Sequence, residues 1–98
     1  MKIVLLEEAQ RLFEAEDTWW RNNRDSKDLF VEEFEQALKQ LSSMPEAAQH
    51  YRRVRGKAIQ RVLMEKTRCH VYYACDREHD LIEIHSVWGA RRGRGPKL

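Results

Sequence analysis

The sequence predicts an α+β fold, in which a twisted antiparallel sheet is covered on one face by a hairpin of two helices. The first half of the chain repeats apolar residues at helical spacing, and the second half is rich in β-branched and aromatic residues. Of the 98 residues, 42% are hydrophobic and 35% are charged, a balance typical of a globular chain with one core. We therefore expect residues 1–98 to form one domain with the element order β-α-α-β-β-β.

A strand and a first helix are predicted at the start of the chain. The apolar run KIVLL at residues 2–6 is typical of a buried strand. Glu7 and Glu8 follow it, and acidic residues are favoured at a helix N-terminus because of the helix dipole. The apolar stripe of a helix over 7–22 consists of Ala9, Leu12, Phe13, Trp19 and Trp20.

A second helix is predicted over residues 27–42. Its apolar stripe consists of Phe30, Phe34, Ala37, Leu38 and Leu41. Pro45 follows the helix, and proline disfavours helical backbone at the residue before it. The connection between the two helices is short and polar, so the helices should form an antiparallel hairpin.

Three strands are predicted in the second half, over residues 58–65, 68–75 and 81–88. Val, Ile and Tyr dominate these stretches, and the polar residues 76–80 form a hairpin loop between the last two strands. Residues 89–98 contain three glycines and Pro96 together with several arginines, which predicts a basic, flexible C-terminal tail.

Charge is divided unevenly along the chain. Residues 1–48 contain 6 Lys or Arg against 11 Asp or Glu, whereas residues 49–98 contain 12 against 5. A basic surface on a small protein favours a polyanion or an acidic protein as its partner. Segregation of solvated charges without a function is the alternative.

The cysteines and the hydropathy of the chain predict a cytoplasmic protein. Cys69 and Cys75 are six residues apart on one predicted strand, too far apart to form a disulfide at about 3.3 Å per residue. We find no signal-peptide pattern and no apolar run of membrane-spanning length. We expect no membrane association.

The second half of the chain also carries a succession of motifs. An Arg-bearing strand precedes the aromatic strand at residues 70–73, an acidic turn begins at Asp76, and the last strand ends in Trp88 followed by Arg91 and Arg92. Upstream, residues 34–41 are followed by Met44 and Pro45. This pattern resembles the RelE/ParE toxin superfamily, and more closely its ParE-like plasmid-stabilisation branch. The resemblance covers nearly the whole chain and implies the same β-α-α-β-β-β fold.

The resemblance implies the toxin of a type II toxin–antitoxin system, which inhibits bacterial growth and is neutralised by a cognate antitoxin. Relatives inhibit either DNA gyrase, by binding it, or translation, as ribosome-dependent mRNA endonucleases. Many relatives carry His two residues before the Arg pair, where this chain has Gly89, and the tail here lacks the Tyr or His of the nucleases. We therefore expect a gyrase-binding inhibitor, with the ribosome and mRNA as alternative targets and a non-toxic, antitoxin-binding relic as a further alternative.

Basic residues and one tryptophan are the candidate site. The expected target-binding residues are Arg55, Arg61, Arg68, Trp88, Arg91, Arg92 and Arg94. If the chain is a nuclease, the resemblance implies Lys57, Arg61, Arg91 and Arg92 as its catalytic residues, because several cations replace a conventional acid–base pair in RelE-like enzymes. Recruitment of an acidic antitoxin is the alternative role for these cations. No cofactor, metal or small-molecule substrate is expected.

The remaining candidates are histidines and tryptophans. His50 is expected in a polar connection, and a metal site made of Cys75, His79 and His85 is not supported by their spacing. Trp19 and Trp20 are expected in the core, although one of them is a candidate wall for a groove that an antitoxin helix fills. Trp88 either anchors the tail or stacks on a partner.

Overall fold

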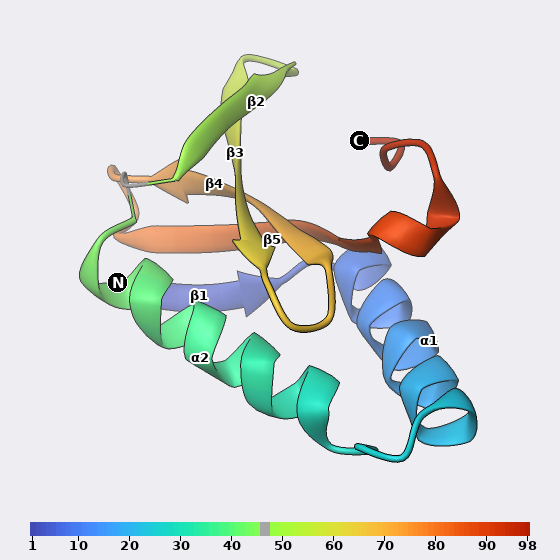
Figure 1. Ribbon diagram of the computed structural model, residues 1–98. Coiled ribbons are helices and arrows are strands. Elements are labelled where there is room, and N and C mark those ends of the chain that lie inside the picture. Colours follow the sequence, from blue (N-terminus) through green and yellow to red (C-terminus); the bar gives the residue numbers. More distant parts are fainter. Residues whose placement is uncertain (46–47) are drawn as a thin grey trace.

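The computed structural model describes residues 1–45 and 48–98. The elements in chain order are β1 (Lys2–Leu5), α1 (Glu7–Asn23), α2 (Leu29–Ser43), β2 (Gln49–Val54), β3 (Lys57–Met64), β4 (Cys69–Asp76), β5 (Leu81–Gly89) and the 3-10 helix η1 (Ala90–Arg92). The strands form one sheet in the order β1-β5-β4-β3-β2, and both helices lie on the same face of it (Figure 1). The predicted α+β class is confirmed. No helix in the described part of the chain is long and apolar enough to cross a membrane.

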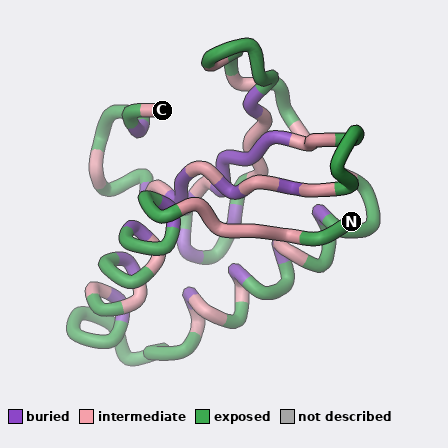
Figure 2. Tube along the Cα trace, turned by 180° about the vertical axis from the view of Figure 1, so that it is seen from behind, coloured by how far each residue is buried: buried purple, intermediate pink, exposed green. Residues whose placement is uncertain are grey.

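The main core lies between the two helices and the sheet. Figure 2 shows that buried residues concentrate on the strands and on the helix surfaces that face them. Phe13 of α1 joins the helices, because its ring lies 5.3 Å from that of Phe30 and 4.8 Å from that of Phe34, measured between centroids. The core residues with the largest side chains are Trp20, Phe30, Phe34, Leu41, Met64, Tyr73, Ile82 and Ile84. Full burial of one such side chain contributes about 1.5–3 kcal/mol.

A bulge in β5 sets which side chains reach this core. Tyr73 pairs with Ile84 and Tyr72 pairs with Ser86, so His85 is an extra residue in β5. The extra residue shifts the alternation of side chains by one. As a result, Ile84 before the bulge and Val87 after it both pack in the helix-covered core.

Two features of the sheet differ from the expectation. The sheet is mixed, because β1 pairs with β5 in parallel, and an apolar pattern does not encode strand direction. An additional strand, β2, contains His50, which was expected in a loop. The segment QHYRRV is mostly polar and exposed, as is usual for an edge strand, so the β-branched pattern of a buried strand is absent.

The last ten residues fold back across the other face of the sheet, which we call the open face (Figure 1). The chain turns at Gly93, whose φ of 82° is favourable for glycine. Pro96 is buried, and Leu98 packs against a second, smaller cluster made of Ile59, Tyr72 and Ala74. The segment expected to be flexible therefore has contacts with the sheet in this structure.

Candidate target-binding surface

Three aromatic rings and an arginine meet on the open face, and we call Tyr51, Arg61, His70 and Tyr72 the open-face cluster. The Tyr51 and Tyr72 rings pack edge to face at 4.8 Å, and the His70 ring lies 5.9 Å from Tyr72. The Arg61 guanidinium lies 5.1 Å from the centre of the Tyr51 ring. Strand pairing explains the grouping, because Arg61 is the register partner of Tyr72. The cluster combines ring faces with a fixed positive charge.

His70 is the titratable group of this cluster with a shifted pKa. Burial lowers the pKa of His70 below its ordinary value of 6.5, and the charges of Arg61 and Arg68 lower it further. His70 is therefore neutral at pH 7, and a neutral imidazole accepts a proton or a hydrogen bond. Arg61 stays protonated and suits a carboxylate or phosphate.

The C-terminal segment lies against the same face. The indole Nε1 of Trp88 donates a hydrogen bond to the backbone oxygen of Arg94, and the Arg92 guanidinium lies 4.7 Å from the centre of the Trp88 ring. Gly95 approaches Tyr51 so closely that a Cβ atom there would lie 2.7 Å from the tyrosine hydroxyl. Trp88 therefore anchors the tail, one of the two roles expected for it.

The pair Arg91 and Arg92 is held by a buried carboxylate. Glu16 of α1 is 1% exposed. Its Oε1 lies 3.0 Å from a terminal nitrogen of Arg91 and 3.6 Å from Nε of Arg92. The Arg91 guanidinium also lies 4.2 Å from the centre of the Trp19 ring. Gly89 leaves room for this carboxylate, because a Cβ atom there would lie 3.2 Å from Glu16 Oε1. These contacts fasten the end of β5 to α1.

Lys57 also has a carboxylate partner. Its Nζ lies 2.5 Å from Oε1 of Glu83, at a cleft of about 500 Å³. His85 Nε2 lies 3.8 Å from the same oxygen. Burial lowers the pKa of His85 more than Glu83 raises it, so this imidazole is neutral at pH 7. The negative charge of Glu83 offsets the positive charge of Lys57.

The hairpin of β2 and β3 carries three exposed arginines. Arg55 and Gly56 form its two-residue turn with φ values of 51° and 81°, the signs that a type I′ turn requires. Arg52, Arg53 and Arg55 are exposed, and the hairpin tip extends away from the helices (Figures 1 and 2). A protruding basic tip is suited to contact a large partner.

The structure separates the residues that the sequence analysis grouped. The open face or its margin holds Arg61, Trp88 and Arg94. Arg55 is at the tip of the β2–β3 hairpin. Arg68 is in the β3–β4 turn, where its backbone oxygen accepts a hydrogen bond from the backbone nitrogen of Ala90. The four residues expected for a nuclease are not brought together, since Arg91 and Arg92 are held at α1 and Lys57 at Glu83.

Several residues of the site were missed by sequence reasoning. Tyr51 lies in the unpredicted strand, and His70 was placed on a strand without its neighbours. Glu16 had a usable signal: it lies four residues after Leu12 and four before Trp20, on the apolar stripe of α1. An acid on such a stripe requires a cationic partner.

Cys69 is a buried free thiol and Cys75 a partly buried one. Burial raises the pKa of Cys69 to about 12 and also raises that of Cys75, so both are protonated at pH 7. His79 contacts Asp76 at 2.8 Å across the β4–β5 turn. Within residues 1–45 and 48–98, no three His, Cys, Asp or Glu side chains are grouped as metal ligands.

Comparisons with known proteins give a match among solved structures. No family model matches the sequence, and no curated protein matches it. Among solved structures, the chain is similar to a chain of the chromosomal ParDE toxin–antitoxin system from P. aeruginosa, with a TM-score of 0.63 and 11% sequence identity. The match covers 91% of this chain and 95% of that one. At this identity the match shows a shared fold alone, and the fold expected from the resemblance is the one this chain shares with the ParDE chain.

Proposed function

We propose that this protein is the toxin of a type II toxin–antitoxin pair, acting in the bacterial cytoplasm and neutralised by a cognate antitoxin encoded beside it. The fold shared with the ParDE chain supports this proposal. The exposed arginines of the β2–β3 hairpin and of the tail also support it, because a basic surface attracts acidic proteins and proteins that work on nucleic acid. The toxin would carry no cofactor.

The target that the geometry supports best is DNA gyrase, bound without chemistry by the toxin. The observation that carries this choice is the dispersal of the cations. Lys57 is paired with Glu83, and Arg91 and Arg92 with Glu16, so of the expected nuclease set only Arg61 belongs to the open-face cluster. Arg55, Arg61, Arg68, Trp88 and Arg94 are the proposed contact residues, and the exposed Arg52 and Arg53 on the same hairpin as Arg55 join them. Arg91 and Arg92 would act by holding the tail in place.

Pulse labelling in cells tests the target. DNA and protein synthesis are followed immediately after this chain is induced without its antitoxin. A fall in DNA synthesis before protein synthesis is expected, and the pure protein should inhibit gyrase supercoiling. If a large molar excess of the protein over gyrase leaves supercoiling unchanged, gyrase is excluded as the target. Harmless expression of folded protein would identify a non-toxic relic.

Matched charge variants test the surface. Replacing Arg52, Arg53 and Arg55 with Ala should reduce gyrase inhibition by about tenfold or more, because interface arginines are frequent energetic hot spots. Replacing Lys2, Arg11 and Lys27, which are exposed on other parts of the molecule, removes the same charge and should leave inhibition unchanged. Equal effects of the two triple variants would show that net charge alone determines binding.

A second candidate function, ribosome-dependent mRNA cleavage, is favoured by the open-face cluster. The neutral imidazole of His70 is suited to accept a proton from a ribose 2′-OH, and Arg61 to stabilise the charge that develops on the phosphate. Arg61→Ala and His70→Gln should then abolish mRNA cleavage on ribosomes in a folded protein. Cleavage that persists in both variants would remove this candidate.

A further inference from the structure

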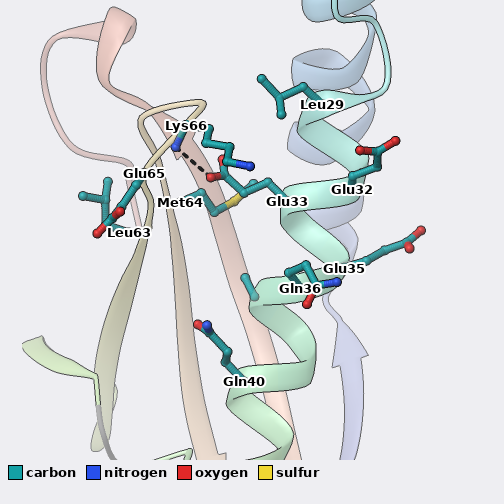
Figure 3. A pocket seen from close by; sticks show the side chains of 11 residues that line it. Leu29, Glu32, Glu33, Glu35, Gln36, Gln40, Leu63, Met64, Glu65 and Lys66 are labelled. Atoms are coloured by element: carbon teal, nitrogen blue, oxygen red, sulfur yellow. Dashed lines mark hydrogen bonds between the residues drawn. The ribbon is translucent and has the colours of Figure 1, made fainter.

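The two faces of the sheet are covered in different ways. On the helix-covered face, the Glu33 carboxylate of α2 ties its helix to the strands, because it accepts hydrogen bonds from the backbone nitrogens of Lys66 and Thr67 at 2.7 and 2.9 Å (Figure 3). Neither α1 nor α2 lies over the open face (Figure 1). Ile59 and Tyr72 at the centre of that face are nevertheless only 0 and 2% exposed, so another part of the chain must contribute to their burial.

Residues 94–98, which we call the strap, lie on this centre. Leu98 packs against the small cluster that contains Tyr72. Gly95 lies so close to the Tyr51 hydroxyl that there is no room for a Cβ atom between them. Tyr51 and Tyr72 are two of the four members of the open-face cluster. The strap therefore covers part of the surface that is the candidate for target binding.

The residues just before the strap are firmly attached. The backbone nitrogen of Ala90 in η1 donates a hydrogen bond to the backbone oxygen of Arg68 at 2.8 Å. Arg91 and Arg92 are ion-paired with the buried Glu16. The base of the strap is thus joined both to the β3–β4 turn and to α1.

The strap itself has weaker attachments. Among the described contacts, its hydrogen bonding to the sheet consists of one bond, in which the Trp88 indole donates to the backbone oxygen of Arg94. Only Pro96 and Leu98 supply apolar side chains, and the backbone has no regular secondary structure. Such a segment opens at a small cost in free energy compared with unfolding of the sheet.

Gly93 separates the firm part of the tail from the weak part. Its φ of 82° is accessible to glycine at little cost, and no atom lies within 4 Å of the position that a Cβ atom would take. Gly95 follows two residues later. Glycine loses more conformational entropy on ordering than other residues, so the two glycines favour an open strap and make Gly93 a hinge.

We propose that the strap is a displaceable cover, which closes the open-face cluster in the free protein and swings away at Gly93 when the target binds. The target would place an apolar side chain against Tyr72, where Leu98 now lies. Opening would also free Trp88 and Arg94, two proposed contact residues that bond to each other in the closed form. The inference rests on the proposed function for the identity of the target, but not for the opening itself.

Nitration of tyrosine rings by tetranitromethane measures the opening. Tyr72 lies beneath the strap, whereas its neighbour Tyr73 faces the helix-covered core and reports unfolding of the whole domain. The full chain carries Tyr51→Phe, so that the more exposed ring is not modified. Leu98→Ala should accelerate nitration of Tyr72 about tenfold and leave the rate at Tyr73 unchanged, because only the local opening becomes easier.

A matched variant separates local opening from general destabilisation. Leu38 on α2 is half-buried like Leu98 but packs against the main core, so Leu38→Ala should change the rates at Tyr72 and Tyr73 by one common factor. The inference is overturned if Leu98→Ala also accelerates both tyrosines equally, or accelerates neither.

Gyrase supercoiling tests whether the opening controls binding. The apparent affinity of a partner falls in proportion to the fraction of open molecules, so Leu98→Ala should inhibit supercoiling at an approximately tenfold lower concentration, and Leu38→Ala at the same concentration as the intact chain. Faster nitration of Tyr72 without stronger inhibition would show that the strap opens but does not control the target. If the intact chain does not inhibit gyrase, the proposed function fails while the nitration rates still decide whether the strap opens.

Discussion

Two groups of arginines in this protein have the same side chain and opposite surroundings. Arg91 and Arg92 at the end of β5 converge on Glu16, which is 1% exposed. Arg52, Arg53 and Arg55 on the β2–β3 hairpin are exposed, and Arg53 bonds only to the backbone oxygen of Gly56 among the contacts described. The first group is part of the internal structure, and the second is available to a partner. Loss of the proposed toxicity after an arginine substitution would therefore have two different causes in the two groups.

The largest expected effect is on stability, from removing the first group. Arg91→Ala with Arg92→Ala leaves the Glu16 carboxylate buried without a cation, which should lower the free energy of unfolding by about 3–5 kcal/mol. Arg53→Ala with Arg55→Ala should change it by no more than about 0.5 kcal/mol. Urea denaturation of both double variants measures the difference, and equal midpoints would contradict the distinction between the two groups.

Neutralising the buried carboxylate should have a smaller effect. Glu16→Gln removes a charged acceptor but leaves an amide of the same shape, so a loss of about 1.5–3 kcal/mol is expected. Adding Glu16→Gln to the Arg91 and Arg92 double variant should restore part of its stability, because no uncompensated charge remains. A thermodynamic cycle over the variants measures this coupling, and strictly additive losses would show that the contacts are independent.

Acid should destabilise the fold through two partly buried histidines. Burial lowers the pKa of His70 and of His85 below 6.5 in the folded state, so the unfolded chain binds more protons as the pH falls through that range. Stability is therefore fully present above pH 6.5 and is lost progressively below it. His70→Gln should reduce the slope of stability against pH between 7.5 and 5.5. His50→Gln, at an exposed position, is the control and should not.

The smallest effect concerns the tail. Gly95→Ala places a Cβ atom against the Tyr51 hydroxyl and should loosen residues 93–98 without unfolding the sheet. Hydrogen exchange of the Trp88 indole N–H should accelerate about tenfold, equivalent to about 1.4 kcal/mol of local stability. Tyr51→Phe removes the hydroxyl and should largely suppress the effect. An unchanged exchange rate in Gly95→Ala would show that the tail does not depend on this contact.

The sequence predicted the framework better than the site. Apolar stripes located both helices, and β-branched runs located β3, β4 and β5, because burial on one face imposes a period on the sequence. No such pattern exists for β2, whose side chains are mostly exposed. The site could not be grouped because the ion pairs join residues far apart in the chain, such as Glu16 with Arg91. The type of residue indicated an affinity for anions, and the fold determined which anion each arginine contacts.

The extra residue in β5 makes the strand tolerant of one particular deletion. His85 is the position at which the alternation of β5 changes phase. If His85 alone is deleted, Ile84 and Ser86 become neighbours in the chain and keep their partners Tyr73 and Tyr72, so Val87 stays in the helix-covered core. Deletion of a residue elsewhere in the strand would instead move the side chains on one side of it to the opposite face. Length variation among related sequences should therefore be more frequent at His85 and in the loop at residues 77–80 than in the rest of β5.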